Sequence, residues 1–176
     1  MAQVIDWRIE LIEAHQGLFH PPEAHPEKAS GYPWCDQGWR DLLERLCGRI
    51  EAALRDGETI RILQIKEKFA SLRCYWRGDV SPETAARIME AVALAQARSA
   101  CTCEQCGAEG RLYKNGGFYM TRCADHAEGM EVSAEPGREH VHLLRRTYGT
   151  SDVYYARYDR ESDTFTEVSA PRGTEE

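Results

Sequence analysis

Two pairs of metal-binding side chains constrain the fold of this chain more than any other feature. Cys103 and Cys106 are separated by two residues, and Cys123 and His126 repeat that spacing further along the chain. A gap of two residues lets a tight turn direct both donors at one point, and thiolate and imidazole are the donors of tetrahedral structural zinc sites. The spacing therefore predicts one structural Zn²⁺ ion held by these four side chains.

The residues between and beside these pairs shape the predicted zinc finger. Residues 115–117 read Asn-Gly-Gly between short apolar stretches, which is a strong signal for a β-hairpin turn. The second ligand pair then falls where a short helix would begin, and this order of knuckle, hairpin and helix start resembles a treble clef. Cys101 leaves a second choice of ligands open, in which Cys101 and Cys103 form the first pair, but the two-residue gap favours the pair of Cys103 and Cys106.

Helical periodicity occurs in three stretches, and we expect helices over residues 5–16, 37–56 and 82–99. Each has a boundary signal. Gly17 and Gly57 follow the first two helices, and Asp36 and Ser81 occupy the positions expected for the N-caps of the second and third. Between the first two helices, residues 19–33 contain four prolines and are expected to form a loop. His20 and His25 in this loop, and His15 shortly before it, are read as solvated polar residues.

Strand patterns fill the remaining segments. Residues 59–69 alternate until Leu63 shifts the phase, which predicts a bulge, and they should pair with residues 72–76 as a hairpin that turns around residues 69–71. After a polar loop at 127–138, the stretches HVHLLRRTYG, DVYYARYD and TFTEVS predict two or three short strands with turns near 149–151 and 160–163. Residues 170–176 are polar and acidic, and we expect them to be disordered.

The predicted fold class is therefore α+β, with three helices around a small, mainly antiparallel sheet. A treble-clef-like zinc finger and a C-terminal β addition complete it. We divide the chain into a helical and β-hairpin core (1–100), the zinc finger (101–127), and the C-terminal β extension with its acidic tail (128–176).

Composition limits the classes of protein that the chain can be. A charged fraction of 29% and a hydrophobic fraction of 42% are typical of a globular protein, and neither a membrane span nor a signal peptide is recognisable. Seven cysteines, three of them in the metal motif, fit a reducing cytoplasm better than a disulfide framework. The formal net charge of −7 argues against non-specific nucleic-acid binding as the main activity.

Three stretches resemble an uncharacterised family of phage and prophage proteins. They are GWRDLLERLCGRI (residues 38–50), QIKEKF-x2-LR-x-Y (64–75), and the two ligand pairs with the glycine after the first, so the resemblance covers about residues 35–127. It implies a small α+β protein of the bacterial host cytoplasm that carries a zinc-binding finger. It brings no established activity, and no functional residue carries over beyond the metal ligands.

Three classes of function follow. The first is a non-enzymatic protein that binds, and inhibits or modulates, a host protein such as a CRISPR or other defence nuclease. The second is a nucleic-acid-binding or regulatory protein that reads its target through the finger, where Tyr113, Phe118 and Tyr119 would stack bases or pack the finger's own core. Its cations would be Arg111, Lys114, Arg122, Arg138, Arg145 and Arg146. The third is a metal-dependent nuclease of the His-Asn-His type, although His126 is already needed for zinc.

Other reactive residues carry weaker signals. His140 and His142 alternate along a predicted strand and could form a metal or acid–base pair, but a surface strand explains them as well. Cys35, Cys47 and Cys74 have no evident histidine partner, and Cys47 and Cys74 are read as small buried hydrophobic residues. No catalytic residue is assigned.

Overall fold

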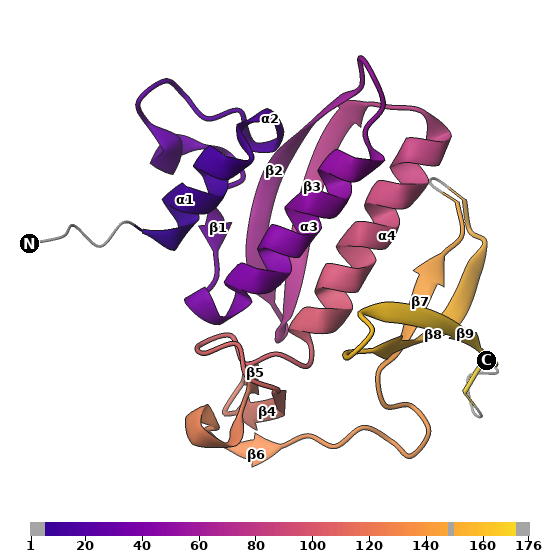
Figure 1. Ribbon diagram of the computed structural model, residues 1–176. Helices are drawn as coiled ribbons and strands as arrows, with labels where there is room; N and C mark the ends of the chain where they lie inside the picture. Colours follow the sequence, from indigo (N-terminus) through magenta and orange to yellow (C-terminus); the bar gives the residue numbers. More distant parts are fainter. Residues whose placement is uncertain (1–5, 148–149, 172–176) are drawn as a thin grey trace, which may run out of the picture.

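The computed structural model describes residues 6–147 and 150–171, and its fold is mixed α and β (Figure 1). Within these residues there are four α-helices rather than the three expected: α1 (Trp7–Ala14), α2 (Gln16–Phe19), α3 (Arg40–Ala53) and α4 (Pro82–Ser99). The strands form three separate three-stranded sheets, one beside the core helices, one in the segment predicted to be the finger and one in the predicted C-terminal β addition. The α+β class itself is confirmed.

The first sheet carries the main core. Strand β2 (Thr59–Lys68) pairs antiparallel with β3 (Ser71–Asp79), and the short β1 (Pro33–Trp34) lies parallel to β2 on its other side. Helices α3 and α4 pack side by side over one face of this sheet (Figure 1). The buried core between the layers contains aliphatic residues of both strands and helices, among them Leu43, Leu46, Ile50, Ile60, Ile62, Ile65, Leu72 and Ile88.

The predicted bulge in β2 is present, and it determines which residues of the strand face the core. The register between β2 and β3 shifts between Ile62 and Gln64. Residues three apart in a regular strand point to opposite faces, but the extra residue lets Ile62 and Ile65 both enter the core, where both are fully buried. The predicted hairpin turn is also confirmed, since Lys68 pairs with Ser71 across Phe69 and Ala70.

Helix boundaries agree with the sequence signals in part. Ser81 caps α4 as expected, because its hydroxyl accepts the Thr84 N–H at 3.2 Å. By contrast, Asp36 caps no helix with its side chain and precedes a 3-10 turn, η2 (Gln37–Trp39), so α3 begins only at Arg40. Gly17 lies inside α2, and Gly57 lies beyond the end of α3, in a turn at φ +83°.

The predicted proline-rich loop at 19–33 is less irregular than expected. It contains the end of α2, a 3-10 turn, η1 (Pro26–Lys28), and the start of β1. The exposed His25 and His20 agree with the polar reading, although His20 Nε2 also lies 2.9 Å from the carbonyl oxygen of Ile60. His15 is half-buried and contacts Glu51 at 2.9 Å.

The second sheet belongs to the predicted finger. Strand β4 (Arg111–Asn115) lies between β5 (Phe118–Arg122) and β6 (Met130–Glu131). Asn115 pairs with Phe118, which confirms the turn at Gly116 and Gly117. The helix expected after Cys123 is a single 3-10 turn, η3 (Ala124–His126).

The third sheet is an antiparallel meander of β7 (Val141–Arg145), β8 (Val153–Asp159) and β9 (Thr164–Val168). It packs on the C-terminal half of α4 through a small apolar cluster that includes Leu94, Ala97, Tyr158 and Phe165. The turn expected at 149–151 includes Gly149, and the tail expected at 170–176 includes residues 172–176. These positions lie outside the described residues.

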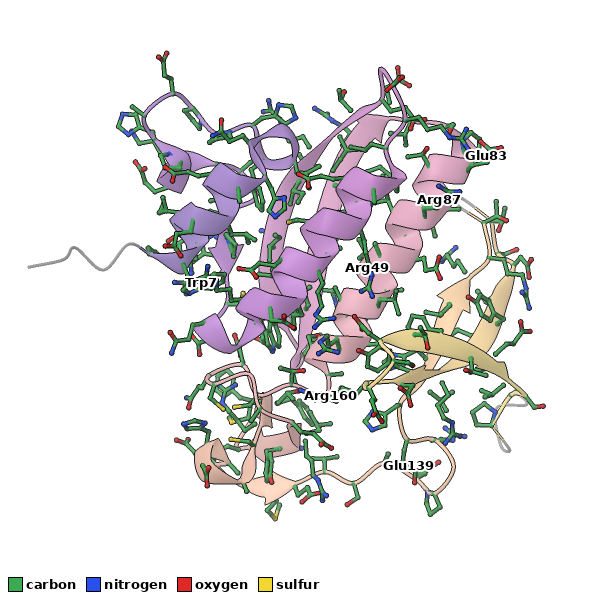
Figure 2. All side chains as sticks on the ribbon, in the orientation of Figure 1. Trp7, Arg49, Glu83, Arg87, Glu139 and Arg160 are labelled. Atoms are coloured by element: carbon green, nitrogen blue, oxygen red, sulfur yellow. The ribbon has the colours of Figure 1, made fainter. Side chains whose placement is uncertain are left out.

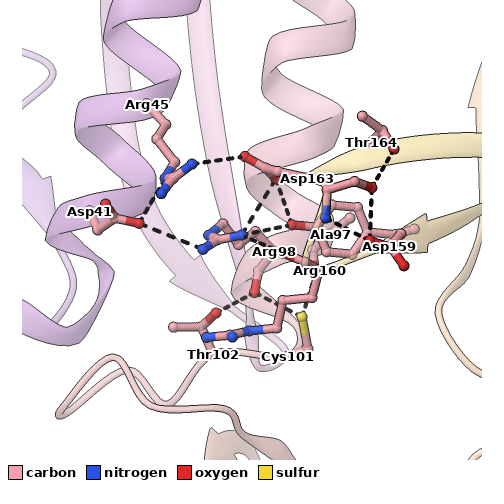
Figure 3. A network of polar contacts seen from close by, with 12 residues as sticks. Asp41, Arg45, Ala97, Arg98, Cys101, Thr102, Asp159, Arg160, Asp163 and Thr164 are labelled. Atoms are coloured by element: carbon pink, nitrogen blue, oxygen red, sulfur yellow. Dashed lines mark hydrogen bonds and ion pairs between the residues drawn. The ribbon is translucent and has the colours of Figure 1, made fainter.

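A buried ionic network fastens this meander to the core (Figure 3). Asp163 is 5% exposed and accepts hydrogen bonds from Arg49 of α3 at 2.8 Å and from the Tyr158 hydroxyl at 2.6 Å. Burial raises the pKa of the Asp163 carboxyl, but these two donors hold it below its usual value. Arg98 of α4 lies 3.7 Å from Asp163 and donates to the carbonyl oxygen of Arg160 at 3.0 Å. Figure 2 shows Arg49 on the helical layer and Arg160 where α4, the meander and the finger meet.

Candidate metal centre

The four predicted ligands meet at one point. Cys103, Cys106, Cys123 and His126 place their donor atoms within 4.8 Å of one another, and no other group of this kind occurs in residues 6–147 and 150–171. The Sγ atoms of Cys106 and Cys123 are 3.7 Å apart. His126 turns its Nδ1 atom toward the cluster, 3.6 Å from Cys103 Sγ and 3.3 Å from Cys123 Sγ.

These distances fit a tetrahedral ion. Bonds of about 2.3 Å to sulfur and about 2.05 Å to nitrogen place two sulfurs about 3.8 Å apart, and a sulfur and a nitrogen about 3.5 Å apart. The observed separations between ligand atoms, 3.7, 3.6 and 3.3 Å, lie close to these expected distances. Three thiols and one imidazole are also a donor set that zinc takes in structural sites. The residues present therefore fit Zn²⁺.

The knuckle at the first pair is built by its own backbone. The Gly107 N–H donates to the Cys103 carbonyl at 2.8 Å, and Gly107 adopts φ +81°, a conformation that glycine takes without strain. Burial alone would raise the pKa of the Cys103 thiol. Backbone N–H groups of Cys123, Cys106 and Gln105 donate toward its sulfur and bring that pKa down to about 6. A thiolate, which is the form that binds metal, is thus favoured near neutral pH.

Cys101 does not join the cluster, so the first ligand pair is Cys103 and Cys106 rather than Cys101 and Cys103. Its thiol is buried and donates back to α4, to the carbonyl oxygen of Arg98 at 3.3 Å. Burial raises the pKa of this thiol to about 11, so it remains protonated. The position suits a small buried residue at the end of the helix.

The knuckle is clamped to the core at Gly38. The Gly38 N–H donates to the Glu104 carbonyl at 2.7 Å, and the next residue, Trp39, donates its indole N–H to the Thr102 carbonyl at 3.0 Å. A Cβ atom at Gly38 would lie 2.3 Å from the carbonyl oxygen of Cys103. Gly38 and Trp39 fall within the helix predicted over residues 37–56, and no local signal in the sequence reveals their contacts with residues 102–107, which are distant in the chain.

A buried ion pair forms the second attachment. Glu104, 9% exposed, lies 3.2 Å from Arg122 of β5, and Glu104 Oε1 also accepts the Asp36 N–H at 3.3 Å. Burial raises the pKa of Glu104, and the contact with Arg122 offsets only part of that rise. Opposite this pair, the Thr121 hydroxyl donates to the Ala70 carbonyl at the β2–β3 turn, at 2.7 Å. The ligand-bearing segments are therefore fixed between η2 and that turn.

The basic residues predicted to surround the finger are mostly neutralised. Arg111 pairs with Glu131, Arg122 with Glu104, Arg138 with Glu135, and Arg146 with Asp152 and Glu167. The aromatic residues do not all pack a small core either, since Phe118 is 78% exposed. The finger itself thus presents little uncompensated positive charge.

The remaining reactive residues do not assemble a second centre within the described ranges. His142 stacks edge-on against Phe165, and burial and the nearby His140 lower its pKa. Burial raises the pKa of the thiols of Cys35 and Cys74 to about 12 and raises that of Cys47 as well. Cys47 is fully buried and Cys74 packs against the core, as expected for small hydrophobic residues.

Comparisons with family models, with curated proteins and with solved structures found no match for this chain. In the part of the chain that the structure describes, no helix has both the length and the apolar composition needed to cross a membrane.

Proposed function

We propose that this chain is a non-enzymatic binding protein in which Cys103, Cys106, Cys123 and His126 hold one structural zinc ion. The observation that carries the proposal is that one tetrahedral cluster receives all four of its donors from protein side chains. A zinc site with four protein ligands has no position left for water or substrate, whereas catalytic zinc keeps one open.

The surroundings of the site support a structural role. The knuckle contacts η2 through Gly38 and Trp39, and β5 contacts the β2–β3 turn through Thr121. A metal at the cluster would therefore hold together segments that are distant in sequence. The knuckle, the β4–β5 hairpin and the single turn at His126 follow one another in the order of a treble clef, and we include that arrangement in the proposal.

The partner that we propose is a protein of a bacterial host, such as a CRISPR or other defence nuclease, with the chain acting in the host cytoplasm. This part rests on the resemblance to phage proteins and on the net charge of −7, which would complement a basic nucleic-acid channel. Affinity capture from a bacterial lysate tests it, with Cys106→Ser as the control that lacks an intact finger. If the parent chain captures no protein that Cys106→Ser fails to capture, a host protein is not the partner.

The structural role is tested by chelation. The indole of Trp39 donates to Thr102 beside the knuckle, so tryptophan fluorescence should report on loss of the metal. We expect EDTA or a stronger chelator to change the fluorescence and lower the melting temperature, and added Zn²⁺ to restore both. A chain that keeps its melting temperature without metal, or that turns over a substrate with zinc-dependent rates, would contradict the proposal.

A further inference from the structure

The face of the first sheet that α3 and α4 leave uncovered is basic, although the chain as a whole is acidic. Ile60, Ile62, Ile65 and Leu72 point into the core, so the residues that alternate with them point outward. Five of those outward residues are cations, and we call them the cationic face: Arg61, Lys66, Lys68, Arg73 and Arg77.

The register places like charges directly opposite each other on this face. Arg61 pairs with Arg77, and Lys66 pairs with Arg73. Cross-strand pairs of like charge destabilise a sheet. No ion pair among the described residues relieves them, since none of the five cations has a carboxylate within 4.0 Å.

The neighbouring polar groups do not neutralise the face either. Arg73 donates to the Ser71 hydroxyl at 2.7 Å and to the Leu72 carbonyl at 2.9 Å, and both acceptors are neutral. Glu67, the nearest acid in sequence to Lys66 and Lys68, accepts the Ala70 N–H at the hairpin turn. A repulsive surface of this kind is stabilised when a polyanion binds to it.

Exposed aromatic rings lie among these cations. Trp34 pairs with Lys66 across β1 and β2 and is 70% exposed, with its ring held edge-on against Tyr32. Tyr75 is 48% exposed, and Lys66 Nζ lies 5.7 Å from the centre of its ring. Burial of such rings is normally favourable, so rings left open beside cations indicate a partner that stacks.

Phe69 extends the same surface at the hairpin tip. It is 70% exposed at φ +52°, in a turn position that usually carries Asn or Gly because other residues are strained there. Lys68 Nζ lies 5.4 Å from the centre of its ring. An aromatic residue that is both strained and solvent-exposed stabilises neither the turn nor the core, which points to a role in binding.

We propose that this face of β1, β2 and β3 binds single-stranded nucleic acid, with phosphates on the cationic face and unpaired bases on Trp34 and Tyr75. Outward residues two apart on a strand lie about 6.7 Å from each other, a spacing that suits successive phosphates of an extended strand. Bases of a duplex are already stacked on one another, so flat, open aromatic rings favour a single strand. This surface is separate from the metal centre, and the inference goes beyond the function proposed above.

The test measures fluorescence anisotropy of labelled oligo-dT and oligo-U of about 20 nucleotides with the full zinc-loaded chain. Arg61→Gln/Arg77→Gln removes two exposed cations from the face, and Arg55→Gln/Arg87→Gln removes two exposed cations elsewhere and is the matched control. Arg87 lies on α4 (Figure 2). We expect the first double variant alone to weaken binding at least tenfold, and to reduce the slope of log K against log salt by about 1.4, or 0.7 per lost phosphate contact.

Trp34→Ala tests the stacking contact, and Trp34→Phe is its conservative counterpart. We expect Trp34→Ala to lose about tenfold in affinity and Trp34→Phe to retain most of it, because stacking of one base contributes a factor of this size. Near-UV circular dichroism and zinc content verify that each variant is folded. Because zinc content is measured separately from nucleic-acid binding, a failure of this inference would not count against the proposed zinc site.

Several results would overturn the inference. They are no binding by the full chain at low salt, equal losses in the two double variants, or tighter binding of a duplex of the same length. Displacement of the oligonucleotide by poly-glutamate at equal charge concentration would also overturn it, because it would assign the face to an acidic protein partner instead.

Discussion

Gly38→Ala tests how the metal unit is joined to the core. The new Cβ would lie 2.3 Å from the Cys103 carbonyl oxygen, 2.4 Å from that of Glu104 and 2.5 Å from the Gly107 nitrogen. All three neighbours are backbone atoms of the knuckle, so no side-chain rotation relieves the overlap. The knuckle must move away from η2.

The cost follows from what that movement breaks. Overpacking by one methyl group in a rigid site costs about 1–3 kcal/mol. The hydrogen bonds from Gly38 N–H and from the Trp39 indole to the knuckle would each contribute about 1 kcal/mol more. Replacing glycine with alanine offsets about 0.4–1 kcal/mol of this cost, because it lowers the conformational entropy of the unfolded chain. The sum is a loss of about 2–5 kcal/mol in the free energy of unfolding.

Urea denaturation in zinc-containing buffer measures this loss, and Gly48→Ala is the matched control. Gly48 is exposed within α3, and a Cβ there meets nothing within 4 Å. Alanine should therefore raise stability by about 0.8–1 kcal/mol at Gly48 through helix propensity alone. If Gly38→Ala unfolds at the same urea concentration as the parent chain, the proposed clamp between η2 and the knuckle does not exist.

Two further predictions concern carboxylates. Glu58 accepts hydrogen bonds from the Ser81 N–H and the Thr84 hydroxyl, and its pKa falls to about 2. Because the folded pKa lies below the unfolded one, this contribution is complete above about pH 4.5 and is lost as the pH falls toward 2. When the free energy of unfolding is measured against pH, Glu58→Gln should lack this loss of stability at acid pH. Identical pH profiles for the variant and the parent chain would refute the role of Glu58. Arg122→Met leaves the buried Glu104 unpaired and should cost about 3 kcal/mol in thermal or urea unfolding. Adding Glu104→Gln should recover most of that, and a double variant no more stable than the single one would refute the pairing.

The metal ligands and local elements were predictable because their signals are local. Two-residue gaps between donors, Asn-Gly-Gly at a turn and Ser-Pro at a helix start each act within a few residues, and the structure has all three features in place. The phase shift at Leu63 likewise predicted the bulge in β2.

Features that depend on distant partners could not be predicted in the same way. Arg49 and Asp163 are 114 residues apart, so neither sequence neighbourhood shows that they pair. Helix α2 has only four residues, too few for a periodic signal, so it falls between the helix predicted over residues 5–16 and the loop predicted over 19–33. Close approach at Gly38 likewise depends on residues that follow α4.

The cationic face was missed although a signal was present. Arg61 and Lys66 fall out of strict alternation because the bulge lies between them, and only the register with Arg73 and Arg77 shows that all four share one face. The basic residues chosen from sequence instead lay near the finger, where carboxylates such as Glu131 and Glu104 pair with them. Local charge density was a poorer guide than strand register.

Native mass spectrometry of the purified chain tests the central claim most directly. The cluster geometry predicts one zinc ion per chain, retained in Cys101→Ser because that thiol lies outside the ligand cluster and donates to the Arg98 carbonyl, and lost in Cys106→Ser because a ligand is removed. A metal-free parent chain with native fold, or equal zinc retention in Cys106→Ser and Cys101→Ser, would contradict the account.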